Sequence, residues 1–229
     1  MTQARNPPAS PNPASAKTTL PSDGYTGRSR RARAEPMLVR PLRDDRYVVE
    51  TDHGTYVVDL DGRTCTCPDH SIRGSRCKHL RRVAIEVTEG RVPPPGKRTS
   101  ACAVCGRRTF VAVTEIGPQL CERHEVAVGD LVRDRETGRR LIVTRVTNRR
   151  ADEATTDDGT TIAAYETNGD YGDHEPVIEA VYLDSVRGLD GSVDASELKR
   201  YGFPASRLRR LGSERVRGAQ ASLDAFAGA

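Results

Sequence analysis

Two short clusters of cysteine and histidine constrain this sequence more than any other feature. They contain all 6 cysteines of the 229-residue chain. The first cluster has the spacing C-x-C-x9-C-x-H and consists of Cys65, Cys67, Cys77 and His79. The second has the spacing C-x2-C-x15-C-x2-H and consists of Cys102, Cys105, Cys121 and His124. Because sets of four such ligands form closed tetrahedral sites, the spacing predicts two structural Zn²⁺ ions.

Composition agrees with small modules held together by metal. Hydrophobic residues make up only 36% of the chain, which has no Trp and 3 Phe. A single large apolar core is therefore not expected, and metal sites can supply the missing stability. The sequence contains no apolar run typical of a signal peptide or a membrane span. We therefore expect a cytoplasmic protein without a membrane partner, and in the cytoplasm clustered cysteines bind metal more often than they form disulfides.

The residues around the first cluster predict how its four ligands meet. The runs RYVVET and TYVVDL predict two strands joined by a turn, and Asp61-Gly62 predicts a second hairpin turn. A helix that begins at Cys77 is predicted by apolar residues at i, i+3, i+4 and i+7, which are Leu80, Val83, Ala84 and Val87. A strand end would then supply two thiolates, and the start of a helix would supply the other two ligands. His70 is interpreted as a loop residue, with replacement of His79 as a ligand the alternative.

The segment TCTCPDHSIRGSRCKHLRRVAIEV resembles a SWIM zinc finger, as found in helicase-like ATPases, transposases and small prokaryotic, archaeal-like proteins. The resemblance extends over roughly residues 40–90. It rests on the four ligand positions together with Pro68-Asp69, Arg73-Gly74 and the triplet from Lys78 to Leu80. It implies a ββα zinc fold that binds DNA or protein and does not catalyse a reaction.

The second cluster resembles zinc-ribbon or treble-clef-like fingers in general. Gly106 follows the C-x2-C pair and predicts a tight loop, and the run TFVAVTE predicts a strand that returns the chain to the second pair of ligands. Two alternatives remain for this cluster: a reduced loop without metal, or a redox-active C-x2-C pair. The βαβ pattern that usually carries such a redox pair is absent from the sequence.

The sequence predicts an α+β protein of consecutive modules. Residues 126–193 resemble a small antiparallel SH3-like β-barrel, with strands on both sides of a Thr-Gly turn and further strands over 160–166 and 176–183. A capping box predicts a short helix from Asp194. The expected modules are a disordered basic tail over 1–36, a SWIM-like finger over 37–95, a second finger over 96–125, the barrel over 126–193, and a short helix with a basic segment over 194–229.

Charge is distributed unevenly, although the formal net charge is only +4. Nucleic-acid contacts are predicted for five basic residues that lie within ten positions, Arg73, Arg76, Lys78, Arg81 and Arg82. The alternative interpretation is that they only offset a zinc centre of charge −1. The arginines between 28 and 33 are either a solvated linker or an arm that contacts the nucleic-acid backbone. The acidic stretch over 152–175 is expected to face away from nucleic acid.

These observations predict a zinc-dependent binding protein that is not an enzyme. The sequence has no phosphate-binding loop, dinucleotide fingerprint or nucleophile elbow, and both zinc sites would be filled by protein ligands. We expect nucleic acid as the partner, DNA rather than RNA, and no small-molecule substrate. The alternative is an adaptor whose fingers dock a recombinase-like or ATPase-like protein.

Overall fold

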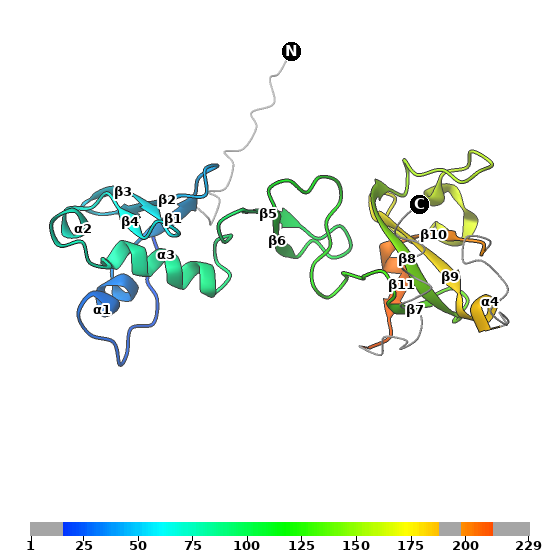
Figure 1. The fold of residues 1–229 in the computed structure, drawn as a ribbon, viewed down its shortest axis with the longest axis horizontal. Coiled ribbons are helices and arrows are strands. Elements are labelled where there is room, and N and C mark those ends of the chain that lie inside the picture. Colours follow the sequence, from blue (N-terminus) through cyan, green and yellow to red (C-terminus); the bar gives the residue numbers. More distant parts are fainter. Residues whose placement is uncertain (1–15, 188–197, 213–229) are drawn as a thin grey trace, which may run out of the picture. The chain divides into compact units, whose positions relative to one another are not determined.

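The structure, a computed structural model, describes residues 16–187 and 198–212 of the chain (Figure 1). Helices and sheets are mixed, which confirms the expected α+β class. The chain divides into two compact units between Arg98 and Thr99. Within the described residues, no helix is long and apolar enough to cross a membrane.

The first unit contains a four-stranded antiparallel sheet with its strands in chain order. Its strands are β1 (Leu38–Pro41), β2 (Tyr47–Thr51), β3 (Gly54–Asp59) and β4 (Thr64–Cys65). Both predicted hairpins are confirmed, because β2 pairs with β3 and β3 pairs with β4. Alternate residues of β2 are buried, as expected for a strand with one face on the core.

Helix α3 (Lys78–Thr88) lies between this sheet and the helix α1 (Gly27–Ala34), as Figure 1 shows. The short helix α2 (Pro68–Arg73) connects β4 to α3. The core of the unit is formed by apolar side chains of the sheet and of α3, among them Tyr47, Val49, Val58, Leu80 and Val83. The predicted helix over the second half of the first cluster is therefore confirmed. Leu80, Val83 and Val87 of its apolar stripe pack in this core, whereas Ala84 does not belong to it.

Residues 16–36 differ from the predicted disordered tail. They pack on α3, with Leu20 and Ala32 buried, and Thr18 pairs with Met37 through two backbone hydrogen bonds of 2.9 and 3.1 Å. Helix α1 has the sequence GRSRRARA and almost no apolar face. The buried guanidinium of Arg82 donates to the carbonyl oxygen of Ala32 in α1 and to that of Thr18 before it, and a hydrophobic pattern cannot reveal such polar contacts.

The second unit contains a five-stranded antiparallel sheet in the order β10-β9-β8-β7-β11. Its strands are β7 (Leu131–Asp134), β8 (Arg140–Arg150), β9 (Pro176–Tyr182), β10 (Tyr201–Pro204) and β11 (Leu208–Arg210). The outer strands β10 and β11 do not pair with each other, so the described part of the chain contains an open sheet and no closed barrel. The closed form of the predicted SH3-like barrel is therefore not seen.

Two local predictions for this unit differ from the structure, and a third falls mostly on residues that the structure does not describe. Residues 201–210 complete the sheet at both edges, and do not form a separate basic segment after residue 193. The predicted strand over 160–166 is wrong, because the 3-10 helices η2 (Ile162–Ala164) and η3 (Glu166–Asn168) occupy that stretch. The helix α4 (Leu183–Arg187) follows β9. Most of the predicted helix from Asp194 lies outside the described residues.

The second Cys/His cluster belongs to the same unit as the sheet. Strands β5 (Lys97–Ala101) and β6 (Arg108–Ala112) form a two-stranded sheet beside the cluster. Val104 and Leu120 pack against the core of the larger sheet, and Nε2 of His174 lies 2.9 Å from the carbonyl oxygen of Ala103. The predicted second finger and the predicted barrel therefore share a core, and are not independent modules.

Candidate metal centres

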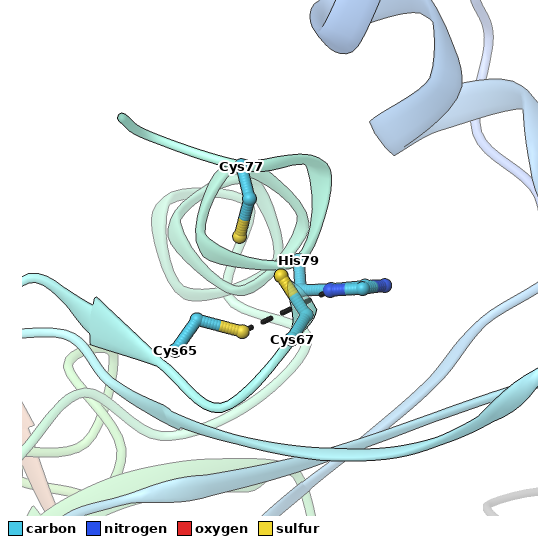
Figure 2. Close-up of side chains that lie close together, drawn as sticks. All are labelled: Cys65, Cys67, Cys77 and His79. Carbon is cyan, nitrogen blue, oxygen red and sulfur yellow. Dashed lines mark hydrogen bonds between the residues drawn. The ribbon is translucent and has the colours of Figure 1, made fainter. Parts of the chain in front are cut away.

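The four ligands of the first cluster converge where the end of β4 meets the start of α3 (Figure 2). Their ligand atoms all lie within 4.8 Å of one another, and all four residues are buried. Sγ of Cys65 lies 3.8 Å from Nδ1 of His79. The predicted origin of the ligands is confirmed for Cys65, which ends β4, and for Cys77 and His79 at the start of α3. Cys67 lies beyond the strand, at the N-cap of α2.

Local structure fixes two of these sulfur atoms at helix N-termini. The Cys67 side chain caps α2, accepting a hydrogen bond from the backbone N–H of His70 at 3.4 Å. The Cys77 side chain caps α3, accepting from the N–H of Leu80 at 3.5 Å. Free N–H groups and the helix dipole at such ends favour a negative sulfur. The short helix α2 begins with Pro68 and ends at Gly74, whose left-handed φ of 60° lets the chain turn back toward Cys77.

The thiols of the first cluster differ in acidity. A hydrogen bond from Cys65 is the largest influence on Cys77 and lowers the pKa of Cys77 to about 3. The same hydrogen bond, followed by burial, raises the pKa of the Cys65 thiol. Burial is the largest influence on Cys67 and raises the pKa of its thiol as well. Cys77 is therefore the sulfur of this cluster that ionises most readily, and a thiolate is the form of cysteine that binds metal.

The imidazole of His79 is held by an aromatic neighbour. The ring of Tyr56 on β3 stacks on it with a centroid distance of 4.4 Å and an interplanar angle of 21°. Nδ1 faces the sulfur of Cys65, whereas Nε2 is buried and has no hydrogen-bond partner among the described residues. This orientation makes Nδ1 the nitrogen that is available to a metal. His70 is not part of the cluster, since its Nδ1 lies 3.1 Å from the carbonyl oxygen of Ser75.

The second cluster has the same ligand types in a more open setting. Nδ1 of His124 lies 3.5 Å from Sγ of Cys102 and 3.4 Å from Sγ of Cys121, and Cys105 and Cys121 are 3.8 Å apart between sulfur atoms. Cys102 and Cys121 are buried, whereas Cys105 is exposed. Gly106 has a φ of 68° and donates its N–H to the carbonyl oxygen of Cys102, forming the predicted tight loop.

The Cys102 thiol is acidified although it is buried. Burial is the largest single influence and opposes ionisation, but backbone hydrogen bonds from Cys121, Cys105 and Val104 together outweigh it. The result lowers the pKa of Cys102 to about 6. A cysteine in this environment is a ready thiolate ligand near neutral pH.

Both donor sets fit zinc. A tetrahedral ion with Zn–S near 2.3 Å and Zn–N near 2.0–2.1 Å places its sulfur ligands about 3.8 Å apart and its sulfur and nitrogen ligands about 3.6 Å apart. The separations between ligand atoms in the second cluster, 3.4, 3.5 and 3.8 Å, lie close to these values. In the first cluster the separation between Cys65 and His79 is 3.8 Å. Each cluster is thus a compact set of three thiolates and one imidazole that could hold one ion.

The fold and the ligand set define a small Cys3His module built on a hairpin sheet and a helix. Residues 56–87 match the family of the SWIM zinc finger. This match covers the first cluster, most of β3 and nearly all of α3, and it leaves the rest of the chain unassigned. No curated protein and no solved structure matches the chain.

The structure separates the five basic residues predicted to contact nucleic acid. Arg73 and Arg76 are exposed, and Arg81 is partly exposed. Lys78 is half-buried and forms an ion pair with Glu35. The prediction for Arg82 is wrong, because its side chain is fully buried and hydrogen-bonded on all three nitrogens. Its position on α3 places it between the N-terminal segment and Glu86, and not on the outer face of the helix.

The sequence pattern also missed the contribution of α1 to this surface. Helix α1 places Arg28 beside α2, where its guanidinium pairs with Asp69 through two hydrogen bonds of 2.9 and 3.0 Å. That pairing is the largest cause of the lowered pKa of Asp69. Arg30 and Arg31 on the same helix are exposed. The one signal in the sequence is the run GRSRRARA itself, which was interpreted as a linker or an unfolded arm.

Proposed function

We propose that the first unit is a zinc-dependent nucleic-acid-binding module, for DNA rather than RNA. The observation that carries the proposal is the pair Arg76 and Arg81, whose guanidinium groups have no carboxylate partner anywhere in residues 16–187 and 198–212. Arg73 extends the same surface from the end of α2, although it shares Asp69 with Arg28. Exposed, unneutralised arginines are suited to bidentate contact with phosphate groups.

The ion pairs of the first unit argue against the view that these arginines only offset a zinc centre. Asp69 and Glu35 already pair with the neighbouring Arg28 and Lys78, so basic charge is neutralised by carboxylates where the fold requires it. Arg76 and Arg81 form no such ion pair with a carboxylate of the described residues. Arg81 is nevertheless oriented, since it donates to the carbonyl oxygen of Arg76 and to the hydroxyl of Ser29, each at 3.3 Å. A positioned charge without a partner favours a ligand contact.

The salt dependence of binding tests this proposal. We expect a labelled DNA titrated with the full chain to show log K falling with log salt at a slope of about −3, as three phosphate contacts require. The double variant Arg76→Ala/Arg81→Ala should flatten the slope by about 2. The matched control is Arg43→Ala/Arg63→Ala, which removes two exposed arginines from turns of the same unit. A double variant with unchanged affinity and slope would contradict the proposal.

One observation favours the alternative of a protein-interaction adaptor. Ile72 on α2 is 82% exposed, although it is a large apolar side chain. Such a residue beside Arg73 suits a protein partner better than a phosphate backbone. If Ile72→Ser abolished co-purification of a specific protein while DNA binding was absent from the wild type, the adaptor function would replace the proposed one.

We propose that neither cluster is catalytic. Each set has three cysteines and one histidine, which fill the four positions of a structural zinc site and leave none for water or substrate. The same reasoning assigns both clusters a stabilising role. Metal-dependent turnover by a protein in which all eight ligands still bind their ions would contradict this proposal.

We also propose that the sheet of the second unit is a variant of the SH3-like barrel. The support is its strand order, in which the last strand β11 lies beside the first strand β7. The last strand is thereby added next to the first, and closing the sheet into a barrel would require only that its two outer strands, β10 and β11, meet. An experimental structure in which β11 lies elsewhere would contradict this assignment.

A further inference from the structure

A cleft of about 300 Å³ lies between α1 and α3 in the first unit. One part of its lining is basic, namely Arg33, Arg76 and Arg81. Another part is apolar or aromatic, and is provided by Tyr25, Ala84 and Ile85. A small hollow that combines cationic and apolar walls fits a ligand with an anionic group at one end and a flat apolar group at the other.

The basic groups around the cleft are held in place before any ligand arrives. Arg33 lies over the ring of Tyr25, with its guanidinium carbon 4.4 Å from the ring centroid, and donates to the carbonyl oxygen of Pro21 at 3.3 Å. Arg81 is anchored by Ser29 and by the carbonyl oxygen of Arg76. Fixed guanidinium groups lose less conformational entropy on binding than free ones do.

Negative charge at the cleft is limited. Glu89 is the one acidic residue in its lining, and it pairs with Arg33 at 3.6 Å and with Arg91 at 2.9 Å. The positive charges of Arg76 and Arg81 are not neutralised by any carboxylate of the described residues. The cleft therefore has net positive charge, which favours a phosphate group over a cationic or neutral ligand.

The size and lining of the cleft distinguish two forms of nucleic acid. Its volume is near the lower end of the range of about 300–1,000 Å³ for ligand sites in proteins, so it has room for one nucleotide and not for a stacked base pair. Tyr25 is 45% exposed and offers a ring surface on which a base can stack. A base leaves the stack at the least energetic cost in a single strand, and aromatic rings beside basic groups are typical of proteins that bind single strands.

We propose that the cleft between α1 and α3 binds one unstacked nucleotide of single-stranded nucleic acid. The phosphate contacts Arg76 and Arg81, and the base packs against Tyr25, Ala84 and Ile85. The inference rests on the proposed function. It adds that the bound nucleic acid is single-stranded and that Tyr25 is the residue on which its base stacks. It also gives the folded N-terminal segment a role, because α1 supplies one wall of the cleft.

The test compares a labelled single-stranded oligonucleotide with its duplex, using the full chain at one salt concentration. The wild type is expected to bind the single strand more tightly. Tyr25→Ala should weaken single-strand binding about fivefold or more, as the loss of one base stack predicts. Ala84→Phe should do the same by filling the cleft without changing any charge, and both variants should leave duplex affinity within about twofold.

Ala34→Phe is the matched control, because Ala34 is exposed on α1 and does not line the cleft. It should bind both forms like the wild type. Tyr25→Ala also removes the ring under Arg33, so hydrogen exchange of residues 18–37 should first show that the variant keeps its fold. Unchanged single-strand affinity in that folded variant would overturn the inference while the proposed function stands. Absence of binding to either form by the wild type would refute the proposed function itself, and the inference with it.

Discussion

Arg82 of α3 donates a hydrogen bond from Nη2 to the carbonyl oxygen of Thr18 at 2.6 Å, across 64 positions of the chain. The same guanidinium donates to the carbonyl oxygens of Ala32 and Met37 and pairs with Glu86 at 2.6 Å. The helix that carries His79 therefore also fastens the N-terminal segment. Through this contact the first metal centre and the arginines of α1 become parts of one unit.

We predict that Arg82→Met destabilises the first unit by about 3–5 kcal/mol, because it leaves Glu86 buried without its partner and frees the carbonyl groups of the N-terminal segment. Denaturant unfolding measures the loss, and hydrogen exchange should show reduced protection of residues 18–37. The neighbouring variant Arg81→Met, at a partly exposed position, should change stability by no more than about 0.5 kcal/mol. Equal effects of the two variants would contradict the assignment.

Loss of one ligand should unfold one unit only. Cys77→Ser removes a buried ligand, and structural zinc contributes on the order of 10–16 kcal/mol, as much as the whole stability of a typical domain. We expect the first unit to lose its hydrogen-exchange protection while β7, β8 and β9 keep theirs, since the chain divides between Arg98 and Thr99. Uniform loss of protection in both units would show that they fold together.

The two clusters should lose metal at different rates. Cys105 is exposed and His124 is half-buried, whereas all ligands of the first cluster are buried. A chelator therefore reaches the second cluster more easily, and a coloured indicator should record a fast and a slow phase of release. Cys121→Ser should remove the fast phase and keep the slow one. Loss of the slow phase instead would reverse the assignment.

The buried pair Asp134 and Arg207 predicts an acid-sensitive contribution to the second unit. Burial is the largest influence on Asp134 and opposes ionisation, but hydrogen bonds from Arg207 and Thr137 outweigh it, so the pKa of Asp134 is lowered from its usual value of 3.8. A carboxyl with a lowered folded-state pKa stabilises the fold above its unfolded value and loses that contribution as pH falls through the folded value.

Asp134→Asn should therefore be less stable than the wild type at pH 7, by about 3–5 kcal/mol for a broken buried pair. The difference between the two proteins should shrink as pH falls below about 4, where unfolded aspartate becomes protonated. Comparing the two proteins at each pH cancels the acid sensitivity of the metal ligands, which both share. A difference that stays constant from pH 7 to pH 2 would contradict this role for Asp134.

The sequence predicted the first metal centre well because its signals are local. Ligand spacing, the turn at Asp61-Gly62 and the apolar stripe of α3 all act over a few residues, and all three predictions are confirmed. The tight loop at Gly106 was predicted for the same reason.

The features that were missed depend on polar contacts between distant residues. Arg82 follows a ligand histidine on an otherwise amphipathic helix, and nothing nearby shows that its partners are carbonyl groups around residues 18–37. Strands β10 and β11 were missed because their pairing partners lie in earlier strands: Tyr201 lies opposite Ala180 of β9, and Leu208 opposite Asp134 of β7. The buried ion pair of Arg207 and Asp134, 73 positions apart, is equally distant in sequence.

Metal content tests the central claim most directly, because we propose that both the stability of the first unit and its basic surface depend on bound zinc. Protein purified without chelator should contain two zinc ions per chain. Cys77→Ser and Cys121→Ser should each contain one, and the double variant none. A wild-type ratio near one, with Cys102 and Cys121 alkylated freely, would remove the second centre; a ratio near zero would contradict the account as a whole.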